Sequence, residues 1–527
     1  MPISEREKNK VILATPPTVS HRTAEENLGI GYLAAILRKN NYEVDIIDGW
    51  LEGFSVSEMG EKILLGQKPL FLGFSVYPSN LSQALKVIEY LKMRNFGGPF
   101  VAGGYGPTFH QTEFLKAGFD VILRGEAEGS IKKLADHYVN GYPRLSEIPG
   151  IGYIEGDREI IIPNSPSKTD IETLPFPSRD TLPLVLKRKT PVHISSSRGC
   201  EGHCLFCSIV TFQRLSKNPQ WRQRSIQNFV DELEYLINMG AYFFKVVDDS
   251  FIEPPRDEKW TCELADEINR RSLTVLLRGS IRADRVSEGV LQNLKDAGFV
   301  SFSCGIENFS PSALKRMAKT ATVDRNLETL ELFKKLGIIM QQGMILFDYR
   351  TTLDEIEENY QGMRKYDHTV IKGVFTEMYA AEGTPLTKLL SQRSLLLRDQ
   401  LFLGNYRYLI QDERARIAYF ALKAWHRSHS RIYDMAIDPL SAPKALNRVE
   451  MAMFLPLARS IRYRDLDFMR DVLDRVSEGR SEQEIMQFTQ EEIERTIHWY
   501  DQFRIQVEQA YKVAGLVYDA EENPFVC

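Results

Sequence analysis

Residues 195–210 read SSSRGCEGHCLFCSIV and place Cys200, Cys204 and Cys207 within eight positions. The chain has 527 residues and only six cysteines, so half of its thiols stand in this one stretch. Sparse, clustered cysteines in a reducing compartment are typical of metal binding or catalysis, whereas a disulfide framework needs spaced pairs. The stretch therefore predicts a metal site or a redox site.

The composition is that of a globular protein, and it argues against several classes of function. Hydrophobic residues make up 43% and charged residues 26% of a chain with a net charge of −5, so no basic field favours nucleic acid. No stretch approaches the roughly 18 consecutive apolar residues of a membrane helix, and the start MPISEREKNK lacks the apolar core of a signal peptide. We expect two or three domains in the cytoplasm, with no nucleic-acid partner and no membrane span.

The first 140 residues alternate short apolar strands with amphipathic helices. This alternation predicts right-handed βαβ crossovers and a parallel, doubly wound, Rossmann-like sheet in a domain that spans residues 1–141. Such sheets bind ligands at the carboxyl ends of their strands. The expected strands are residues 11–17, 42–48, 70–75, 100–104 and 120–125.

Turn residues follow four of these strands. The GGYG segment at 103–106 lacks the G-x-G-x-x-G spacing of a dinucleotide site, and its glycines could serve only to turn the chain. Four such loops at one sheet edge nevertheless favour a ligand site. The loops contain Thr15 to Pro17, Ser75 to Tyr77, Gly103 to Pro107, and Gly125 with Glu126.

The rest of the chain changes its pattern three times. Residues 142–191 contain a hairpin pattern and a proline-rich run, so we expect a linker with a β-hairpin there. Six further strand–helix units predict a partial (β/α)6, TIM-like barrel over residues 192–390, with its chemistry at the carboxyl ends of the strands. Helical patterns over residues 391–527 predict an α-helical cap. The expected barrel strands are residues 192–197, 242–249, 273–279, 299–307, 338–348 and 370–380.

The cysteine stretch follows the first of these barrel strands, so it falls at the catalytic rim. Three thiolates can bind three irons of a [4Fe–4S] cluster and leave the fourth iron open for a ligand. A zinc site made by Cys200, His203, Cys204 and Cys207 is the alternative. Zinc sites normally join ligand pairs from separated segments, and the adjacent His203 and Cys204 would strain a tetrahedron.

The spacing C-x-x-x-C-x-F-C, with Phe206 before the last cysteine, resembles the radical S-adenosylmethionine (radical SAM) superfamily. Together with the preceding βα domain, the chain looks like the cobalamin-dependent branch of that superfamily over roughly residues 10–390. Further matching segments are WRQRS (221–225), DDSF (248–251), LRGSIRADRV (277–286), GIENFSPSALKRMAKTAT (305–322), GMILFD (343–348) and EGTPL (382–386).

The resemblance implies three cofactors: a [4Fe–4S] cluster on the three cysteines, S-adenosylmethionine, and cobalamin. The D-x-H-x-x-G motif that supplies a histidine to cobalt in other cobalamin proteins is absent. For S-adenosylmethionine the resemblance implies contacts to Phe206, Asp248, Asp249, Arg278, Arg282 and Glu307. For cobalamin it implies contacts to Thr15, Pro16, Ser75, Val76, Tyr77, Gly103, Gly104, Tyr105, Gly106, Thr108, Gly125 and Glu126.

Several of these charged residues also have simpler explanations. Asp249 could cap a turn, and Arg278 and Glu307 could form a salt bridge at the end of the barrel. The pattern of charges at strand ends is a safer prediction than any single residue. No residue beyond the cofactor ligands is expected to act as a catalytic acid or base.

The resemblance further implies an enzyme that methylates an unactivated carbon of a small-molecule biosynthetic intermediate, through a 5′-deoxyadenosyl radical and methylcobalamin. An electron donor such as flavodoxin or ferredoxin would then be a partner. One alternative is a radical cyclase or rearrangement enzyme without methyl transfer. Another, from a different class, is a zinc-stabilised cobalamin-binding or sensing protein without catalysis.

Overall fold

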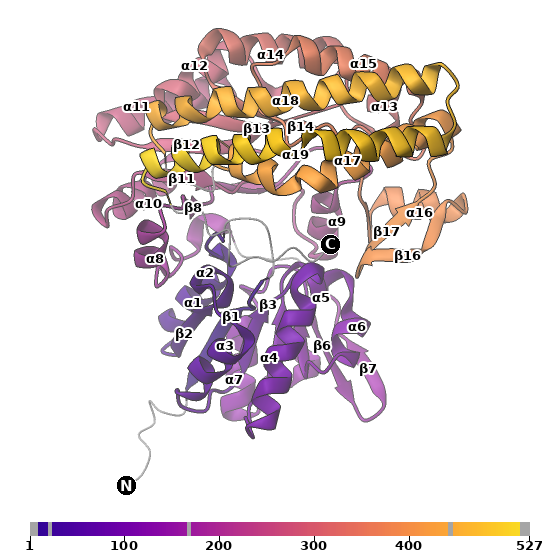
Figure 1. The fold of residues 1–527 in the computed structure, drawn as a ribbon. Coiled ribbons are helices and arrows are strands. Elements are labelled where there is room, and N and C mark those ends of the chain that lie inside the picture. The colour runs from indigo at the N-terminus through magenta and orange to yellow at the C-terminus, as the bar shows by residue number, and fades with distance from the viewer. Residues whose placement is uncertain (1–8, 19–23, 166–169, 441–445, 517–527) are drawn as a thin grey trace.

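The computed structural model describes residues 9–18, 24–165, 170–440 and 446–516. The amino-terminal domain lies beneath a strand-and-helix barrel, and three long helices of the carboxyl-terminal region cross one side of that barrel (Figure 1). The expected fold class is confirmed: an α/β chain with a Rossmann-like domain, a partial barrel and a helical carboxyl-terminal region.

The first sheet has seven strands in the order β2-β1-β3-β4-β5-β6-β7. Strands β1 to β5 are parallel, and the hairpin β6–β7 adds antiparallel to β5. The sequence placed this hairpin in a linker, but it covers the edge of β5, which would otherwise expose unpaired backbone groups. The strands are β1 (Lys10–Thr15), β2 (Glu43–Asp48), β3 (Leu72–Ser75), β4 (Phe100–Gly103), β5 (Val121–Leu123), β6 (Ile151–Glu155) and β7 (Arg158–Ile161).

Helices cover both faces of this sheet, as the doubly wound pattern requires. Apolar side chains of α1 and α7 pack on one face, and those of α3, α4 and α6 pack on the other. The carboxyl ends of the parallel strands therefore form one edge that faces the barrel (Figure 1). The helices are α1 (Leu28–Lys39), α2 (Gly49–Glu52), α3 (Val56–Leu64), α4 (Leu81–Met93), α5 (Tyr105–Phe109), α6 (Gln111–Lys116) and α7 (Ile131–Asn140).

The barrel sheet has five strands in the order β14-β13-β12-β11-β8, and all its neighbouring strands are parallel. The sixth expected strand, residues 370–380, makes only isolated parallel bridges at Val370 and Glu377. Gly373, at a φ of +76°, interrupts the extended backbone there. The strands are β8 (Val192–Ile194), β11 (Phe243–Val246), β12 (Leu276–Arg282), β13 (Phe299–Glu307) and β14 (Ile339–Met344).

The barrel helices alternate with the strands along the chain. A short antiparallel ribbon, β9 (Ser197–Gly199) with β10 (Trp221–Gln223), stands beside the sheet after β8. The helices that precede or belong to the barrel are α8 (Leu182–Lys187), α9 (Ser208–Leu215), α10 (Ile226–Asn238), α11 (Glu258–Arg270), α12 (Glu288–Asp296), α13 (Pro311–Arg316), α14 (Val323–Leu336) and α15 (Leu353–Lys365).

The carboxyl-terminal region differs from the purely helical expectation at its start. Helix α16 (Pro385–Gln392) leads into a three-stranded antiparallel sheet of β15 (Ala380–Ala381), β16 (Leu396–Phe402) and β17 (Asn405–Tyr408). Gly404, at a φ of +74°, forms the turn between β16 and β17. The expectation of helix from residue 391 onward is therefore wrong for this short stretch.

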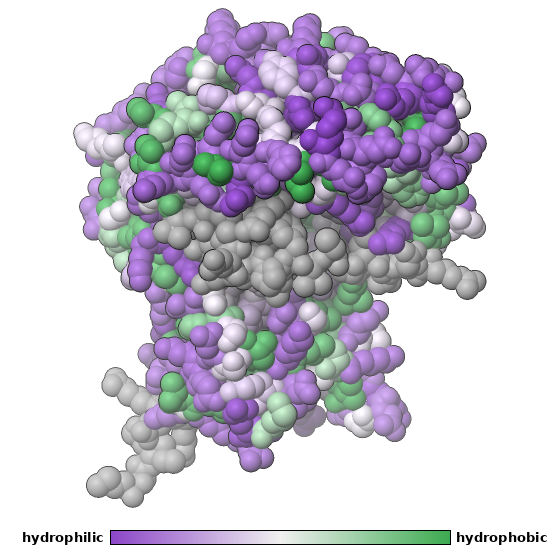
Figure 2. Space-filling view, in the orientation of Figure 1, coloured by the Kyte–Doolittle hydropathy of each residue, from purple (hydrophilic) through white to green (hydrophobic). Residues whose placement is uncertain are grey.

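Three long helices follow: α17 (Glu413–Ile437), α18 (Arg448–Ser477) and α19 (Glu482–Val513). Their buried residues join the core of the barrel, while their outer face is mostly hydrophilic (Figure 2). Asp465 lies fully buried between them and accepts hydrogen bonds from Trp425 Nε1 at 2.8 Å and Tyr433 OH at 2.7 Å. Among the helices of the described residues, none is both long and apolar enough to cross a membrane.

Candidate active site and cofactor sites

The cysteine loop connects β9 to α9, and backbone hydrogen bonds fix it at several points. Cys200 N donates to Gln220 O at 3.1 Å, and the Gln220 side chain donates back to Cys200 O at 3.0 Å. Further along, Leu205 N donates to Met317 O at 3.0 Å. Cys207 is the N-cap residue of α9. The barrel therefore holds a loop that carries three thiols at its rim.

The thiols of Cys200, Cys204 and Cys207 are free and partly buried. Cys200 Sγ lies 3.4 Å from Glu253 Oε1 and 3.9 Å from Arg282 Nη1. Burial raises the pKa of the Cys200 thiol to about 12, with the Glu253 carboxylate adding to the rise, and burial also raises the pKa values of the other two. A metal must therefore displace protons from this loop when it binds.

The loop offers the donor chemistry that an iron–sulfur cluster requires. Within the described parts of the chain, no three Cys, His, Asp or Glu side chains converge closely enough to hold one metal ion. A cubane presents three irons at separate corners to three thiolates. The donor set of three thiols in one loop fits a [4Fe–4S] cluster.

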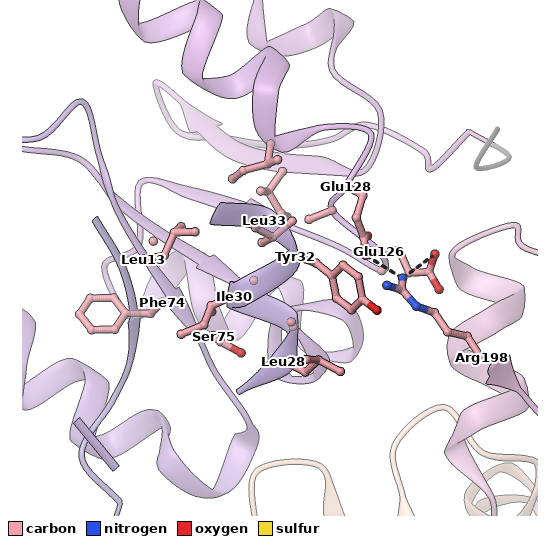
Figure 3. A pocket seen from close by; sticks show the side chains of 18 of the residues that line it. Leu13, Leu28, Ile30, Tyr32, Leu33, Phe74, Ser75, Glu126, Glu128 and Arg198 are labelled. Atoms are coloured by element: carbon pink, nitrogen blue, oxygen red, sulfur yellow. Dashed lines mark hydrogen bonds and ion pairs between the residues drawn. The ribbon is translucent and has the colours of Figure 1, made fainter. Parts of the chain in front are cut away.

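A cavity of about 300 Å³ lies between the strand ends of the first sheet and the barrel. Most of its wall is apolar and comes from the first domain, including Leu13, Ile30 and Phe74, with Arg198 reaching in from the barrel side (Figure 3). Arg198 forms ion pairs with Glu126 and Glu128 at the rim (Figure 3). The cavity thus stands where a doubly wound sheet binds its ligand.

Five of the residues expected to bind cobalamin line this cavity: Ser75, Gly103, Gly104, Gly125 and Glu126. The nearest atoms to a Cβ placed on Gly103 are 4.0 Å away, so the glycine leaves open space toward the cavity. The cavity wall is mostly apolar, and its charged side chains are Glu126, Glu128, Arg198 and Asp249.

Tyr77 and Tyr105 lie outside the cavity wall and bridge toward the barrel. The ring of Tyr77, which is 55% exposed, stacks on Tyr105 with 6.2 Å between centroids. Tyr105 stacks in turn on Phe212 of α9, also at 6.2 Å. Thr15 accepts a hydrogen bond from Asn27 Nδ2 at 3.2 Å beside Pro16, also outside the wall.

Three other residues expected to contact cobalamin support the loops from behind the cavity wall. Val76 is fully buried, and its N–H donates to Gly103 O at 2.9 Å. Gly106 packs so closely that an added Cβ would stand 2.5 Å from Phe114 Cζ. The Thr108 hydroxyl accepts from Gly125 N at 2.8 Å and fixes the next loop.

Four of the residues expected at S-adenosylmethionine lie in or near the cysteine loop or the cavity. Asp249 lines the cavity, and burial together with the neighbouring Asp248 carboxylate raises its pKa to about 6. Arg282 approaches Cys200, as given above. Glu307, at a φ of +63°, accepts from Lys319 Nζ at 2.9 Å. Phe206 packs, partly buried, against a small apolar cluster beside the loop.

Arg278 and Asp248 are both buried and bind other parts of the protein. Arg278 lies in the first half of β12, 2% exposed, and donates to Leu440 O at 2.6 Å and Gln341 Oε1 at 2.6 Å. It fastens the barrel to the helical region. Asp248, 3% exposed, accepts from Ser196 N at 2.7 Å and Ser197 Oγ at 2.7 Å, so it fixes the chain before the ribbon.

Sequence reasoning missed four residues of this region. Arg198 and Tyr32 line the cavity, Glu253 contacts Cys200, and Lys319 pairs with Glu307. Arg198 could have been found, because it directly precedes the cysteine loop. Tyr32 could have been found from its place on the helix that follows the first strand, since such helices begin at the binding edge. The sequence around Glu253 and Lys319 contains no local motif that would identify them as site residues.

Two protein families match the chain in the places that the geometry indicates. Residues 16–135 match the B12 binding domain, and residues 194–361 match the radical SAM superfamily. The chain is 28% identical over 399 residues to an uncharacterized methyltransferase of Pyrococcus horikoshii, covering 74% of this chain and 84% of that protein. It is 26% identical to an anaerobic magnesium-protoporphyrin IX monomethyl ester cyclase of Rubrivivax gelatinosus, covering 64% of this chain and 62% of the cyclase.

The fold as a whole also has a solved counterpart. The cobalamin-dependent S-adenosylmethionine radical enzyme OxsB, with aqua-cobalamin and S-adenosylmethionine bound, aligns with a TM-score of 0.76 and 19% identity over 97% of this chain and 84% of OxsB. The cofactors of this chain are a [4Fe–4S] cluster, S-adenosylmethionine and cobalamin. The chain therefore carries a B12 binding domain and a radical SAM domain, and its fold matches that of a cobalamin-dependent radical SAM enzyme.

Proposed function

We propose that the chain is a methyltransferase that adds a methyl group to an unactivated carbon of a small-molecule biosynthetic intermediate. The observation that carries the proposal is the placement of the cavity, whose walls come from the first domain and from barrel residues that include Arg198, Phe212 and Asp249. In this proposal the cobalamin site and the cluster site open toward the same space between the two domains. The methyltransferase relative from Pyrococcus horikoshii agrees with this reaction class.

The cofactors, when bound, supply a carbon-centred radical from S-adenosylmethionine and a methyl group from cobalamin. The protein has to hold the cofactors and the substrate in line and exclude water. Cys200, Cys204 and Cys207 would hold the cluster, while Asp249, Arg282 and Glu307 remain the residues that we assign to S-adenosylmethionine.

The cavity would take only part of cobalamin, because its volume of about 300 Å³ is small for the whole cofactor. Its apolar wall suits the flat nucleotide base of the tail, and the corrin would then lie at the mouth, toward the barrel. Ser75, Gly103, Gly104 and Gly125 are the expected contacts of that tail. A small electron-transfer protein such as flavodoxin or ferredoxin, and a reducing cytoplasmic setting, belong to the same proposal.

A second candidate is a radical cyclase or rearrangement enzyme that transfers no methyl group. The similarity to the magnesium-protoporphyrin ester cyclase favours this second candidate, because a cyclase forms a ring. The residues around the cysteine loop serve either outcome equally well, since both begin with the same radical.

Product analysis separates the two candidates. The full chain, reconstituted without oxygen with iron, sulfide and cobalamin, is given S-adenosylmethionine and a strong reductant, and 5′-deoxyadenosine and S-adenosylhomocysteine are quantified by mass spectrometry. The methyltransferase should form both, whereas a cyclase should form deoxyadenosine alone. Neither product from a cluster-loaded chain would contradict both candidates, and the variant Cys204→Ala serves as the blank.

A further inference from the structure

The ribbon that leads into the cysteine loop carries two arginines at facing positions. Strands β9 and β10 pair antiparallel, with Arg198 directly opposite Arg222. Like charges that face each other across a ribbon repel. The ribbon itself has no acidic residue, because its sequences are Ser-Arg-Gly and Trp-Arg-Gln. The two arginines therefore need acidic partners from elsewhere.

Those partners come from the other domain. Glu126 accepts from Arg222 Nη2 at 2.5 Å and Nη1 at 3.1 Å, a two-point contact. Arg198 Nη1 lies 2.6 Å from Glu128 Oε1 and 3.4 Å from Glu126 Oε2. All four side chains are at most 18% exposed. We call these four residues, Arg198, Arg222, Glu126 and Glu128, the clamp.

The clamp touches the cavity at one end and the cysteine loop at the other. Glu126, Glu128 and Arg198 all line the cavity, and the Arg198 guanidinium lies 5.1 Å from the ring centre of Tyr32 on its wall (Figure 3). On the other side, Arg198 is two residues before Cys200. Arg222 is two residues after Gln220, whose carbonyl accepts from Cys200 N. One short ribbon therefore connects the cavity wall to the cysteine loop.

We propose that the clamp couples the two cofactor sites, so that filling the cobalamin cavity holds the cysteine loop in its cluster-binding geometry. The inference rests on the proposed cofactor sites and adds positioning residues to them. The largely buried, two-point contact of Arg222 with Glu126 fixes direction as well as distance, which suits this role. Because coupling between two sites is reciprocal, an ordered cysteine loop favours cobalamin binding by the same factor.

The test uses the full chain without a cluster, its thiols reduced, and methylcobalamin in the dark as the probe. The rate at which N-ethylmaleimide alkylates Cys200, Cys204 and Cys207 is measured by mass spectrometry with and without the probe. Saturating methylcobalamin should slow alkylation at least about fivefold, the lower end of typical coupling between sites. In Arg198→Gln/Arg222→Gln the slowing should fall below about twofold, and Arg198→Lys/Arg222→Lys should restore part of it.

Removing the arginines alone leaves two carboxylates poorly solvated, which can destabilise the chain. The second variant therefore replaces all four clamp residues by glutamine, so that shape is nearly kept and no charge is left unpaired. It should fold and, at a methylcobalamin concentration shown by titration to saturate this variant, give the same weak slowing as the double variant. The matched control is Arg495→Gln/Glu492→Gln, which removes an ion pair of 2.5 Å on α19, far along the chain from both sites. It should behave like the unmodified chain.

Two results would overturn the proposal, and they differ in meaning. Equal slowing in the four-glutamine variant and in the unmodified chain would mean that the probe merely shields the thiols, and the clamp would have no coupling role. No saturable binding of methylcobalamin to the unmodified chain would overturn the cobalamin site itself, and the clamp with it.

Discussion

Replacing Gly199 by alanine should prevent the cysteine loop from binding its cluster. Gly199 stands directly before Cys200 at a φ of +94°, and a Cβ there would lie 2.0 Å from Gln220 O and 2.9 Å from its carbonyl carbon. Close carbon–oxygen contacts start near 3.3 Å, so the Gln220 carbonyl would have to move by roughly 1.3 Å. That movement breaks the hydrogen bond of 3.1 Å from Cys200 N to Gln220 O.

The cost can be estimated from its two parts. An unfavourable φ costs about 1–3 kcal/mol, and forcing atoms apart in a packed site costs about 1–3 kcal/mol more. The native structure is therefore expected to be destabilised by roughly 2–6 kcal/mol, and the strain lies mainly in the cysteine loop. Gly479→Ala is the matched control, because Gly479 has a φ of +78° but no atom within 4 Å of an added Cβ. It should lose only the conformational part, about 1–3 kcal/mol.

The assay is iron and sulfide content after anaerobic reconstitution, together with the thermal unfolding temperature. Gly199→Ala should retain less than about a quarter of the wild-type iron, and Gly479→Ala nearly all of it, because only the first substitution falls on the cysteine loop. Equal iron in both variants, with equal shifts in unfolding temperature, would refute the reasoning from the ribbon geometry.

Three other predictions concern the cofactor sites and the helical region. Alanine at Cys200, Cys204 or Cys207 should abolish 5′-deoxyadenosine formation while methylcobalamin binding survives; activity in any one variant would remove that residue from the ligand set. Gly103→Leu should fill the cavity and weaken cobalamin binding at least about tenfold, or 1.4 kcal/mol, with iron content unchanged as the control. Burial raises the pKa of Asp465 to about 7 from an ordinary value of 3.8. Between these two pH values the folded chain keeps a proton on Asp465 that the unfolded chain has released. The stabilisation from this proton is therefore complete below about pH 4 and is lost as the pH rises to about 7. Asp465→Asn should therefore gain unfolding temperature relative to wild type between pH 5 and pH 8, and a difference that does not change with pH would contradict the assignment.

The parallel sheets could be read from the sequence because periodicity reports burial directly. The strand over residues 299–307 was predicted with the same bounds that β13 has. The sixth barrel strand was over-predicted, because Gly373 has a left-handed φ that apolar spacing cannot reveal. The three strands after Met378 were missed, since a short exposed sheet carries a weak pattern next to long helices.

Candidate site residues can be predicted from the sequence where the chemistry is local, but not where it depends on tertiary contacts. The spacing of the cysteines and of the glycines at strand ends marks those segments in the sequence. Arg278 looks like a strand-end ligand in the sequence, yet its guanidinium donates a hydrogen bond to the carbonyl of Leu440, 162 residues further along the chain. Glu126 was nominated as a cobalamin contact without its arginine partners, because the pairing with Arg222 spans two domains. Long-range ion pairs of this kind have no signature in a single sequence.

The most direct test of methyl transfer follows the methyl group itself. The reconstituted full chain, with reduced cobalamin and S-adenosylmethionine carrying a trideuterated methyl group, is analysed by mass spectrometry for deuterated methylcobalamin and for 5′-deoxyadenosine. The account predicts both, because the two cofactor sites of one chain serve both reactions. Deoxyadenosine without any deuterated methylcobalamin would contradict the methyltransferase and leave the cyclase or rearrangement reaction in its place.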